Sequence, residues 1–245
     1  MRCRRFLALS AALLAPLVVA CAQKAVAPED SITPISGTEN VGIISADDVV
    51  LAGRLFGSQN DVAVILSHMR PNDQTAWFEF AQELADAGYA ALTFNFRGYG
   101  DSGGDQEFAK LDDDLAAAVG YLHDRGKRQV FLVGASMGGT TSLVVASRAD
   151  VDGVVAISAP AEFEDQDALA AVPNVTVPKL FIASEDDQAA VLAMDELLNA
   201  TGQPKDSEVY PGGAHGTNLF LPDQSESAAA VRQRIFDFLG QYARR

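Results

Sequence analysis

Short hydrophobic runs alternate with longer stretches of mixed polarity along most of the chain. An uninterrupted apolar run is typical of a strand buried on both faces of a sheet, and one is found at 62–67. Other largely apolar runs, at 89–94, 130–133, 154–158 and 179–184, predict further strands. Shorter runs predict an antiparallel hairpin and one late strand, at 41–45, 49–56 and 207–210. Helical spacing predicts helices in between, at about 75–87, 111–125, 189–200 and 225–242. A further helix is predicted to end at 146, and a short one within 162–172.

Strands and helices that alternate in this way predict an α/β protein. We expect a doubly wound, mostly parallel sheet of about eight strands with helices on both faces. The sequence contains no internal repeat, and 245 residues suffice for an N-terminal signal and one domain, which we place at 41–245. In such a sheet, functional residues gather at the carboxyl ends of the strands.

The segment at 129–146, QVFLVGASMGGTTSLVVA, passes from a strand through a sharp turn into a helix. Its G-x-S-x-G pattern is that of a nucleophile elbow with Ser136 at the apex. We expect side chains at Gly134 and Gly138 to collide with their neighbours, because the turn is tight. The first turn of the following helix favours negative charge that develops at the serine. The alternative is a glycine-rich turn whose serine has no catalytic role.

Candidate partners for Ser136 follow two other predicted strands. Asp186 and Asp187 come after the strand at 179–184, and His215 comes after the strand at 207–210. Because parallel strands end at the same edge of a sheet, we expect these side chains to lie near Ser136. A serine that attacks an acyl group needs a histidine as base and a carboxylate to orient that histidine. The chain order of serine, aspartate and histidine suits this arrangement.

Two other histidines are alternatives for the base. His68 stands at the end of a strand, where a buried role in packing or in fixing a loop is expected, and His123 falls on a helix predicted to be exposed. His215 is therefore preferred.

The residues from 41 to 242 resemble the α/β-hydrolase family. The matching segments are the elbow, HMRP at 68–71, FRGYGDSGG at 96–104 and GGAHG at 212–216. The resemblance implies a catalytic triad of Ser136, Asp187 and His215, with Asp186 as the alternative acid. Asp187 is preferred because it takes the fourth position of its turn, where the family carries its acid.

The resemblance also implies an oxyanion hole. One donor would be the backbone N–H of Met137, and the 68–71 segment, which is similar to HGxP-type loops, suggests Arg70 as the second, with Met69 as the alternative. The family usually has glycine where this chain has Met69. For the side chain of Arg70 we consider contact with an anionic substrate or a surface salt bridge.

Other conspicuous residues are expected to have structural roles. Arg97 is predicted to hydrogen-bond carbonyls or a carboxylate within a tight loop. The acidic residues at 112–114 are interpreted as a solvated helix start, and Trp77 as a packing anchor. The sequence offers no convincing metal motif or dinucleotide fingerprint, so no cofactor is expected. The net charge of −15 argues against a nucleic-acid partner.

The N-terminus predicts export. Arg2, Arg4 and Arg5 precede an apolar run at 6–20 that is too short for a comfortable membrane span. The run ends in VVAC, which resembles the lipoprotein box of bacteria and implies lipidation of Cys21 after removal of residues 1–20. A plain signal peptide and an apolar anchor with an incidental Cys21 are the alternatives. Residues 21–40 are predicted to be a flexible tether.

The predicted function is that of a lipid-anchored serine hydrolase outside the cytoplasm. Only about twenty residues separate the strands at 154–158 and 179–184, which leaves no room for a large cap domain. We therefore expect an open site that cleaves carboxylic esters with small or medium acyl groups through an acyl-enzyme on Ser136. The alternatives are a serine peptidase or amidase of the same fold, and a non-catalytic lipoprotein that uses the fold for binding.

Overall fold

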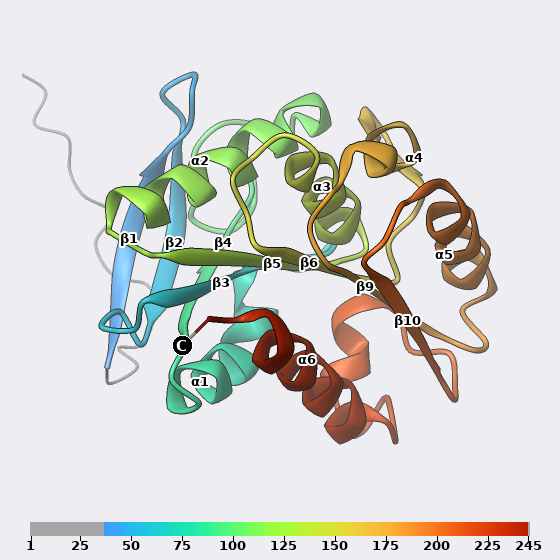
Figure 1. The fold of residues 1–245 in the computed structure, drawn as a ribbon. Coiled ribbons are helices and arrows are strands. Elements are labelled where there is room, and N and C mark those ends of the chain that lie inside the picture. Colours follow the sequence, from blue (N-terminus) through green and yellow to red (C-terminus); the bar gives the residue numbers. More distant parts are fainter. Residues whose placement is uncertain (1–36, 245) are drawn as a thin grey trace, which may run out of the picture. The chain divides into compact units, whose positions relative to one another are not determined.

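A computed structural model describes residues 37–244 of the chain. Cys21, the predicted signal at 1–20 and the predicted tether up to residue 36 lie outside the described residues. The eight-stranded sheet has the order β1-β2-β4-β3-β5-β6-β9-β10 (Figure 1). Its strands are β1 Thr38–Ile44, β2 Val50–Phe56, β3 Val62–Ser67, β4 Ala90–Phe94, β5 Gln129–Ala135, β6 Gly153–Ile157, β9 Lys179–Ser184 and β10 Lys205–Tyr210.

Most of the sheet is parallel. Strand β2 runs antiparallel to both its neighbours, β1 and β4, whereas every other pair of adjacent strands is parallel. The predicted hairpin and the predicted mostly parallel sheet are thus both confirmed. Strand β1 begins at Thr38, so the sheet starts three residues before the predicted boundary at 41.

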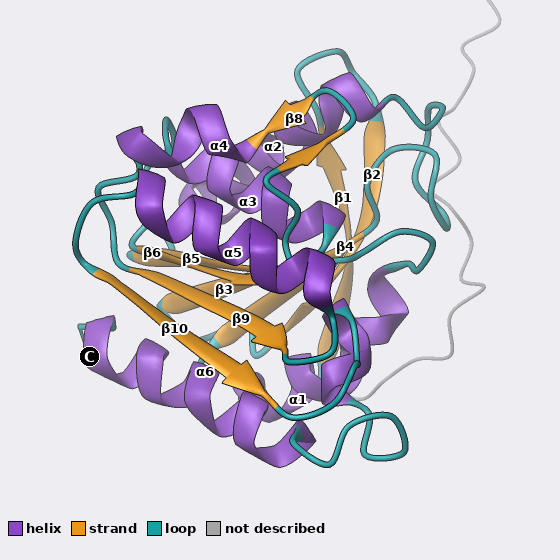
Figure 2. Ribbon diagram, turned by 90° about the vertical axis from the view of Figure 1, so that its right-hand side faces the viewer, coloured by secondary structure: helices purple, strands orange, loops and turns teal. Residues whose placement is uncertain are grey.

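Helices cover both faces of the sheet, as predicted (Figure 1 and Figure 2). Helices α1 (Phe78–Asp86) and α6 (Ala228–Tyr242) lie on one face. The other face carries α2 (Leu111–Asp124), α3 (Met137–Ala146) and α5 (Gln188–Ala200). Short helical turns complete the structure, namely α4 Ala168–Ala171 and 3-10 turns at Gln74–Trp77, Phe108–Lys110, Val172–Asn174 and Gly216–Phe220.

Two hydrophobic cores result from this layering, one on each face. Successive residues of a strand point to opposite faces, so Ile65 of β3 packs in the core beneath α2 and α3, and Val64 packs in the core above α1 and α6. All six residues of β3 are buried. This is the reason why the central strands read as unbroken apolar runs rather than as alternating ones.

The connection from β6 to β9 departs from the prediction in detail. A short helix was expected, but the segment first forms a two-stranded hairpin, β7 Glu162–Phe163 and β8 Gln166–Asp167, and only then the single turn α4. Glu164 at the hairpin turn has a φ of 49°. As predicted, the connection carries no large cap domain.

None of the helices within residues 37–244 combines the length and the hydrophobicity that crossing a bilayer requires.

Candidate active site

The turn between β5 and α3 places Ser136 in a backbone conformation that side-chain-bearing residues seldom adopt. Its φ is 48° and its ψ is −115°, and its N–H donates to the carbonyl of Ile157 at 2.8 Å. A Cβ at Gly134 would lie 2.2 Å from the carbonyl oxygen of Gly138. A Cβ at Gly138 would lie 2.3 Å from the carbonyl oxygen of Ser67. The turn therefore requires glycine at both positions, as the sequence predicted.

Ser136, His215 and Asp187 form a continuous chain of hydrogen bonds. The Nε2 atom of His215 lies 2.8 Å from Oγ of Ser136, and its Nδ1 atom lies 2.6 Å from Oδ2 of Asp187. The alternative acid, Asp186, is exposed, and its backbone N–H donates to the carbonyl of Gly212 at 2.9 Å. Of the two adjacent aspartates, it is thus Asp187 that contacts the imidazole.

The three side chains differ in their contact with solvent. Ser136 is 9% exposed, and the side chain of Asp187 is 14% exposed, whereas that of His215 is 40% exposed. A carboxylate shielded from water holds the imidazole more firmly than an exposed one, because solvent screens the interaction less.

The two residues predicted as oxyanion donors lie in different segments: Met137 directly follows Ser136, and Arg70 lies in the loop after β3. Met137 is the first residue of α3, so its N–H belongs to the helix turn whose amides lack intrahelical acceptors. Arg70 lies in the loop between β3 and the 3-10 turn Gln74–Trp77. Its guanidinium lies 5.2 Å above the ring of Phe108 and 3.7 Å from the carboxylate of Glu164. The side chains of Arg70 and Glu164 are both half exposed. Of the two roles considered for this side chain, the surface salt bridge is the one present.

Met69 packs beneath the loop that carries His215. Its side chain is buried, and its sulfur lies 2.6 Å from the point that a Cβ at Gly216 would occupy. The same two loops are joined by Asn72, whose amide donates to the hydroxyl of Thr217 at 3.1 Å. The methionine that replaces the usual glycine of this loop therefore supports the histidine loop, a role that only the tertiary contact reveals.

His68 fixes a loop, as predicted, and both nitrogens of its ring are engaged with backbone groups there. Its Nδ1 donates to the carbonyl of Met69 at 3.0 Å, and its Nε2 accepts the N–H of Phe96 at 3.1 Å. One nitrogen must carry a proton and the other must not, so the ring is neutral in the folded protein. Burial lowers the pKa of His68 to about 4.

Acid should therefore destabilise the fold through His68. Between pH 6.5 and about 4, the unfolded chain binds a proton at His68 that the folded chain does not. The free energy of unfolding should fall across this window by up to about 3 kcal/mol from this group. Urea unfolding at pH 7 and pH 5 measures the effect, and His68→Asn should show a smaller loss than the wild type. Equal losses in the two proteins would contradict this assignment.

The third histidine lies on α2. Nε2 of His123 is 2.8 Å from the carbonyl oxygen of Asp150, and the ring takes no part in the contacts around Ser136. This agrees with the preference for His215.

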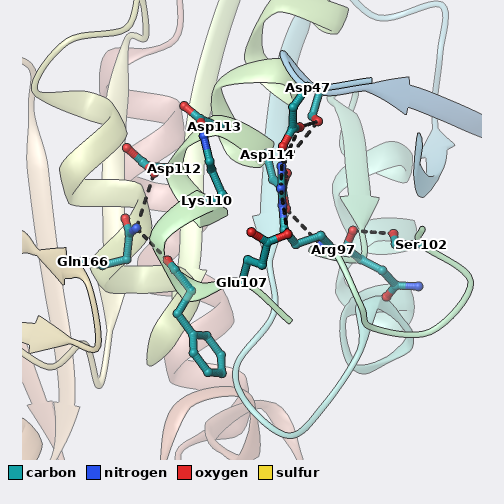
Figure 3. A network of polar contacts seen from close by, with 12 residues as sticks. Asp47, Arg97, Ser102, Glu107, Lys110, Asp112, Asp113, Asp114 and Gln166 are labelled. Carbon is teal, nitrogen blue, oxygen red and sulfur yellow. Dashed lines mark hydrogen bonds and ion pairs between the residues drawn. The ribbon is translucent and has the colours of Figure 1, made fainter. Parts of the chain in front are cut away.

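Arg97 has the predicted structural role, but its partner Asp114 is not solvated as predicted. The guanidinium is fully buried and donates to the carboxylate of Asp114 through Nε at 3.0 Å and Nη2 at 2.7 Å. The backbone N–H of Arg97 donates to the same carboxylate at 2.9 Å, and Nη1 donates to Asp47 at 2.8 Å. Figure 3 shows the guanidinium between these two carboxylates. Asp114 is thus not part of a solvated helix start but is completely buried.

The Arg97 network connects three segments of the chain. It joins the β1–β2 turn through Asp47 and α2 through Asp114 to the segment at 96–104. The neighbouring Phe96 donates to His68, and Tyr99 packs its ring 4.9 Å from the ring of His68. No cluster of His, Cys, Asp or Glu suited to a metal ion occurs among residues 37–244.

Comparisons with known proteins agree with this architecture. The family model described as alpha/beta hydrolase fold matches residues 62–176. The chain is 26% identical to the uncharacterized protein YfhR of Escherichia coli K12 over 149 residues, which cover 57% of this chain and 51% of that protein. The chain thus spans about half the length of the curated relatives it matches.

Solved structures extend the likeness to most of the described residues. An esterase of Pyrococcus furiosus, Pf2001, superposes with a TM-score of 0.72 at 21% identity, over 84% of this chain and 91% of the esterase. A dienelactone hydrolase of Anabaena variabilis superposes with a TM-score of 0.70 at 22% identity, over 85% of this chain and 100% of that one. Sheet order, elbow and family model together identify this chain as having the α/β-hydrolase fold.

Proposed function

We propose that this chain is a serine hydrolase of the α/β-hydrolase family that cleaves carboxylic esters. The observation that carries the proposal is the unbroken chain of contacts from Asp187 through His215 to Ser136. A serine hydroxyl is a weak nucleophile alone, and a histidine within hydrogen-bonding distance is what activates it. The esterase and the dienelactone hydrolase that share the fold act, by their names, on an ester and on a dienelactone, which is consistent with this class of substrate.

The geometry suits a two-step reaction. Oγ of Ser136 attacks the acyl carbon while Nε2 of His215 takes the hydroxyl proton, and Asp187 stabilises the imidazolium. The oxyanion accepts hydrogen bonds from the N–H groups of Met137 and Arg70, with Met69 as the alternative second donor. Each such donor contributes about 3 kcal/mol to the transition state.

The tetrahedral intermediate that carries this oxyanion then collapses, and the ester bond breaks. His215 returns the proton to the leaving alcohol, and the acyl group stays on Ser136. A water molecule then attacks the acyl-enzyme, with His215 again as the base, and releases the acid and the free serine.

The short β6–β9 connection favours small or medium acyl groups. The hairpin β7–β8 and the turn α4 are too small to enclose a long chain above Ser136. We expect p-nitrophenyl esters of two to six carbons to give a kcat/KM at least about tenfold above that of the palmitate. A preference for the palmitate would contradict this expectation.

The same assay separates the two alternative functions. Turnover of aminoacyl or prolyl amides at rates above the esters would favour a peptidase. A folded protein that cleaves neither class would favour a binding role. Either result would overturn the proposal of an esterase.

We further propose that the protein is exported and anchored to a bacterial membrane through lipid on Cys21. The support is the sequence alone: three arginines, an apolar run and the VVAC motif. Several acyl chains on one cysteine suffice for stable anchoring. Cys21→Ser should move the protein from the membrane fraction to the soluble fraction, and an unchanged distribution would contradict lipidation.

A further inference from the structure

Two buried serines hold the backbone on either side of His215. Ser184, the last residue of β9, donates from its hydroxyl to the carbonyl of Ala214 at 2.5 Å. Ser158, which directly follows β6, accepts the N–H of Gly216 on its hydroxyl at 3.1 Å. The two serines are 0% and 1% exposed. One contact thus fixes the residue before the histidine, and the other fixes the residue after it.

Ser158 adopts a strained backbone conformation. Its φ is 47°, in the left-handed region that favours glycine, and its N–H donates to the carbonyl of Ile182 at 2.7 Å. Strain of this kind persists where the surrounding structure demands it, and it commonly marks functional sites. Here the conformation accompanies a hydroxyl that reaches the loop after His215.

Ser184 supports the acid as well as the base. Its carbonyl accepts the N–H of Asp187 at 3.1 Å, while its hydroxyl binds Ala214. A single residue at the end of β9 therefore connects the loop of Asp187 to the loop of His215. Strands β5, β6 and β9 are adjacent in the sheet, so Ser136, Ser158 and Ser184 stand at the ends of three neighbouring strands.

We propose that Ser158 and Ser184 are positioning residues, which set the orientation of His215 between Asp187 and Ser136. The inference rests on the proposed function. The imidazole is 40% exposed and its loop has no regular secondary structure at residues 213–215, so its orientation depends on the contacts that hold this loop. The hydroxyl contacts of Ser158 and Ser184 fix the backbone on both sides of His215, in addition to the contact of the ring with Asp187. A misplacement of about 1 Å at a catalytic group lowers the rate by about a hundredfold, so loss of either contact should be visible in turnover.

Ser158→Gly separates positioning from stability. Glycine tolerates the positive φ but lacks the hydroxyl. We expect the thermal midpoint to stay within about 3 °C of the wild type while kcat falls about tenfold to a hundredfold and KM changes little. The rate constant for inactivation by a fluorophosphonate should fall by the same factor, because that reaction also needs His215 to activate Ser136.

Ser184→Ala and Ser184→Thr form the second test. The alanine variant should lose kcat in the same way, and the threonine variant, which keeps the hydroxyl, should recover most of it. Ser147→Ala is the matched control, because its hydroxyl bonds only the carbonyl of Val144 at the end of α3. The control should keep the wild-type kcat and inactivation rate. All assays use the full-length chain.

The outcomes are distinguishable. Wild-type turnover in Ser158→Gly and Ser184→Ala would overturn the inference and leave the proposed function intact. A loss of turnover that follows a matching loss of thermal stability, without recovery in Ser184→Thr, would also overturn it, because the serines would then be merely structural. A folded wild type that neither cleaves esters nor reacts with the fluorophosphonate would overturn both proposals.

Discussion

Replacement of His215 by glutamine is expected to lower kcat/KM for a short-chain ester by about 10⁴-fold or more. Glutamine can hydrogen-bond Ser136 but cannot take up its proton, so the hydroxyl stays unactivated. The imidazole bridges Ser136 at 2.8 Å and Asp187 at 2.6 Å, and no other histidine among residues 37–244 contacts the serine. Initial rates over a range of ester concentrations measure the loss.

His123→Gln is the matched control for this variant. It makes the same chemical change on α2, where the imidazole of His123 hydrogen-bonds the carbonyl of Asp150. We expect it to retain full activity. A kcat/KM of His215→Gln within tenfold of the wild-type value would contradict the assignment of His215 as the catalytic base.

Replacement of Arg97 by methionine is expected to lower the free energy of unfolding by about 3–5 kcal/mol. The substitution leaves the carboxylate of Asp114 buried at 0% exposure without the cation that neutralises it. Removing one partner of a buried ion pair costs more than the pair itself contributes, because the remaining charge is desolvated. Chemical unfolding of the wild type and the variant at pH 7 measures the difference.

Arg125→Met controls for the loss of a surface arginine. Its ion pair with Glu39 joins side chains that are 41% and 44% exposed, so its loss should cost at most about 1 kcal/mol. Equal losses of unfolding free energy in the two variants would contradict the prediction that the buried Arg97 network contributes more to stability than a surface ion pair.

The loss of unfolding free energy in Arg97→Met should depend on pH. Burial raises the pKa of Asp114, and the hydrogen bonds and charge of Arg97 oppose that rise. Without Arg97 the pKa rises further, so the folded variant takes up a proton that the wild type does not. A carboxyl with a raised pKa in the folded state contributes stability at low pH that is lost as pH rises. The variant should therefore approach the wild type as pH falls.

Local sequence patterns predicted most of the fold. The largely apolar runs at 62–67 and 179–184 coincide with β3 and β9, because most positions of a strand buried on both faces are apolar. The elbow was also predictable, since strand, turn, serine and helix are contiguous in the chain. The hairpin β7–β8 was missed because its strands have only two residues each, too few for a period to emerge.

The residues that surround the site depend on tertiary contacts. Asp114 resembles its neighbours at the start of α2, and only its depth beneath the loop at 96–104 distinguishes it. Asp186 and Asp187 are adjacent and chemically identical, so the direction of the turn after β9 decides which one meets His215. The hydroxyls of Ser158 and Ser184 carry no signal in the sequence, because serine at a strand end is common.

The central claim is that Ser136 is an activated nucleophile. Intact-mass measurement of the full-length chain after reaction with a fluorophosphonate, beside Ser136→Ala, tests it most directly. The account predicts one adduct on the wild type and none on the variant. An unmodified wild type that remains folded, or an adduct of equal yield on Ser136→Ala, would contradict it.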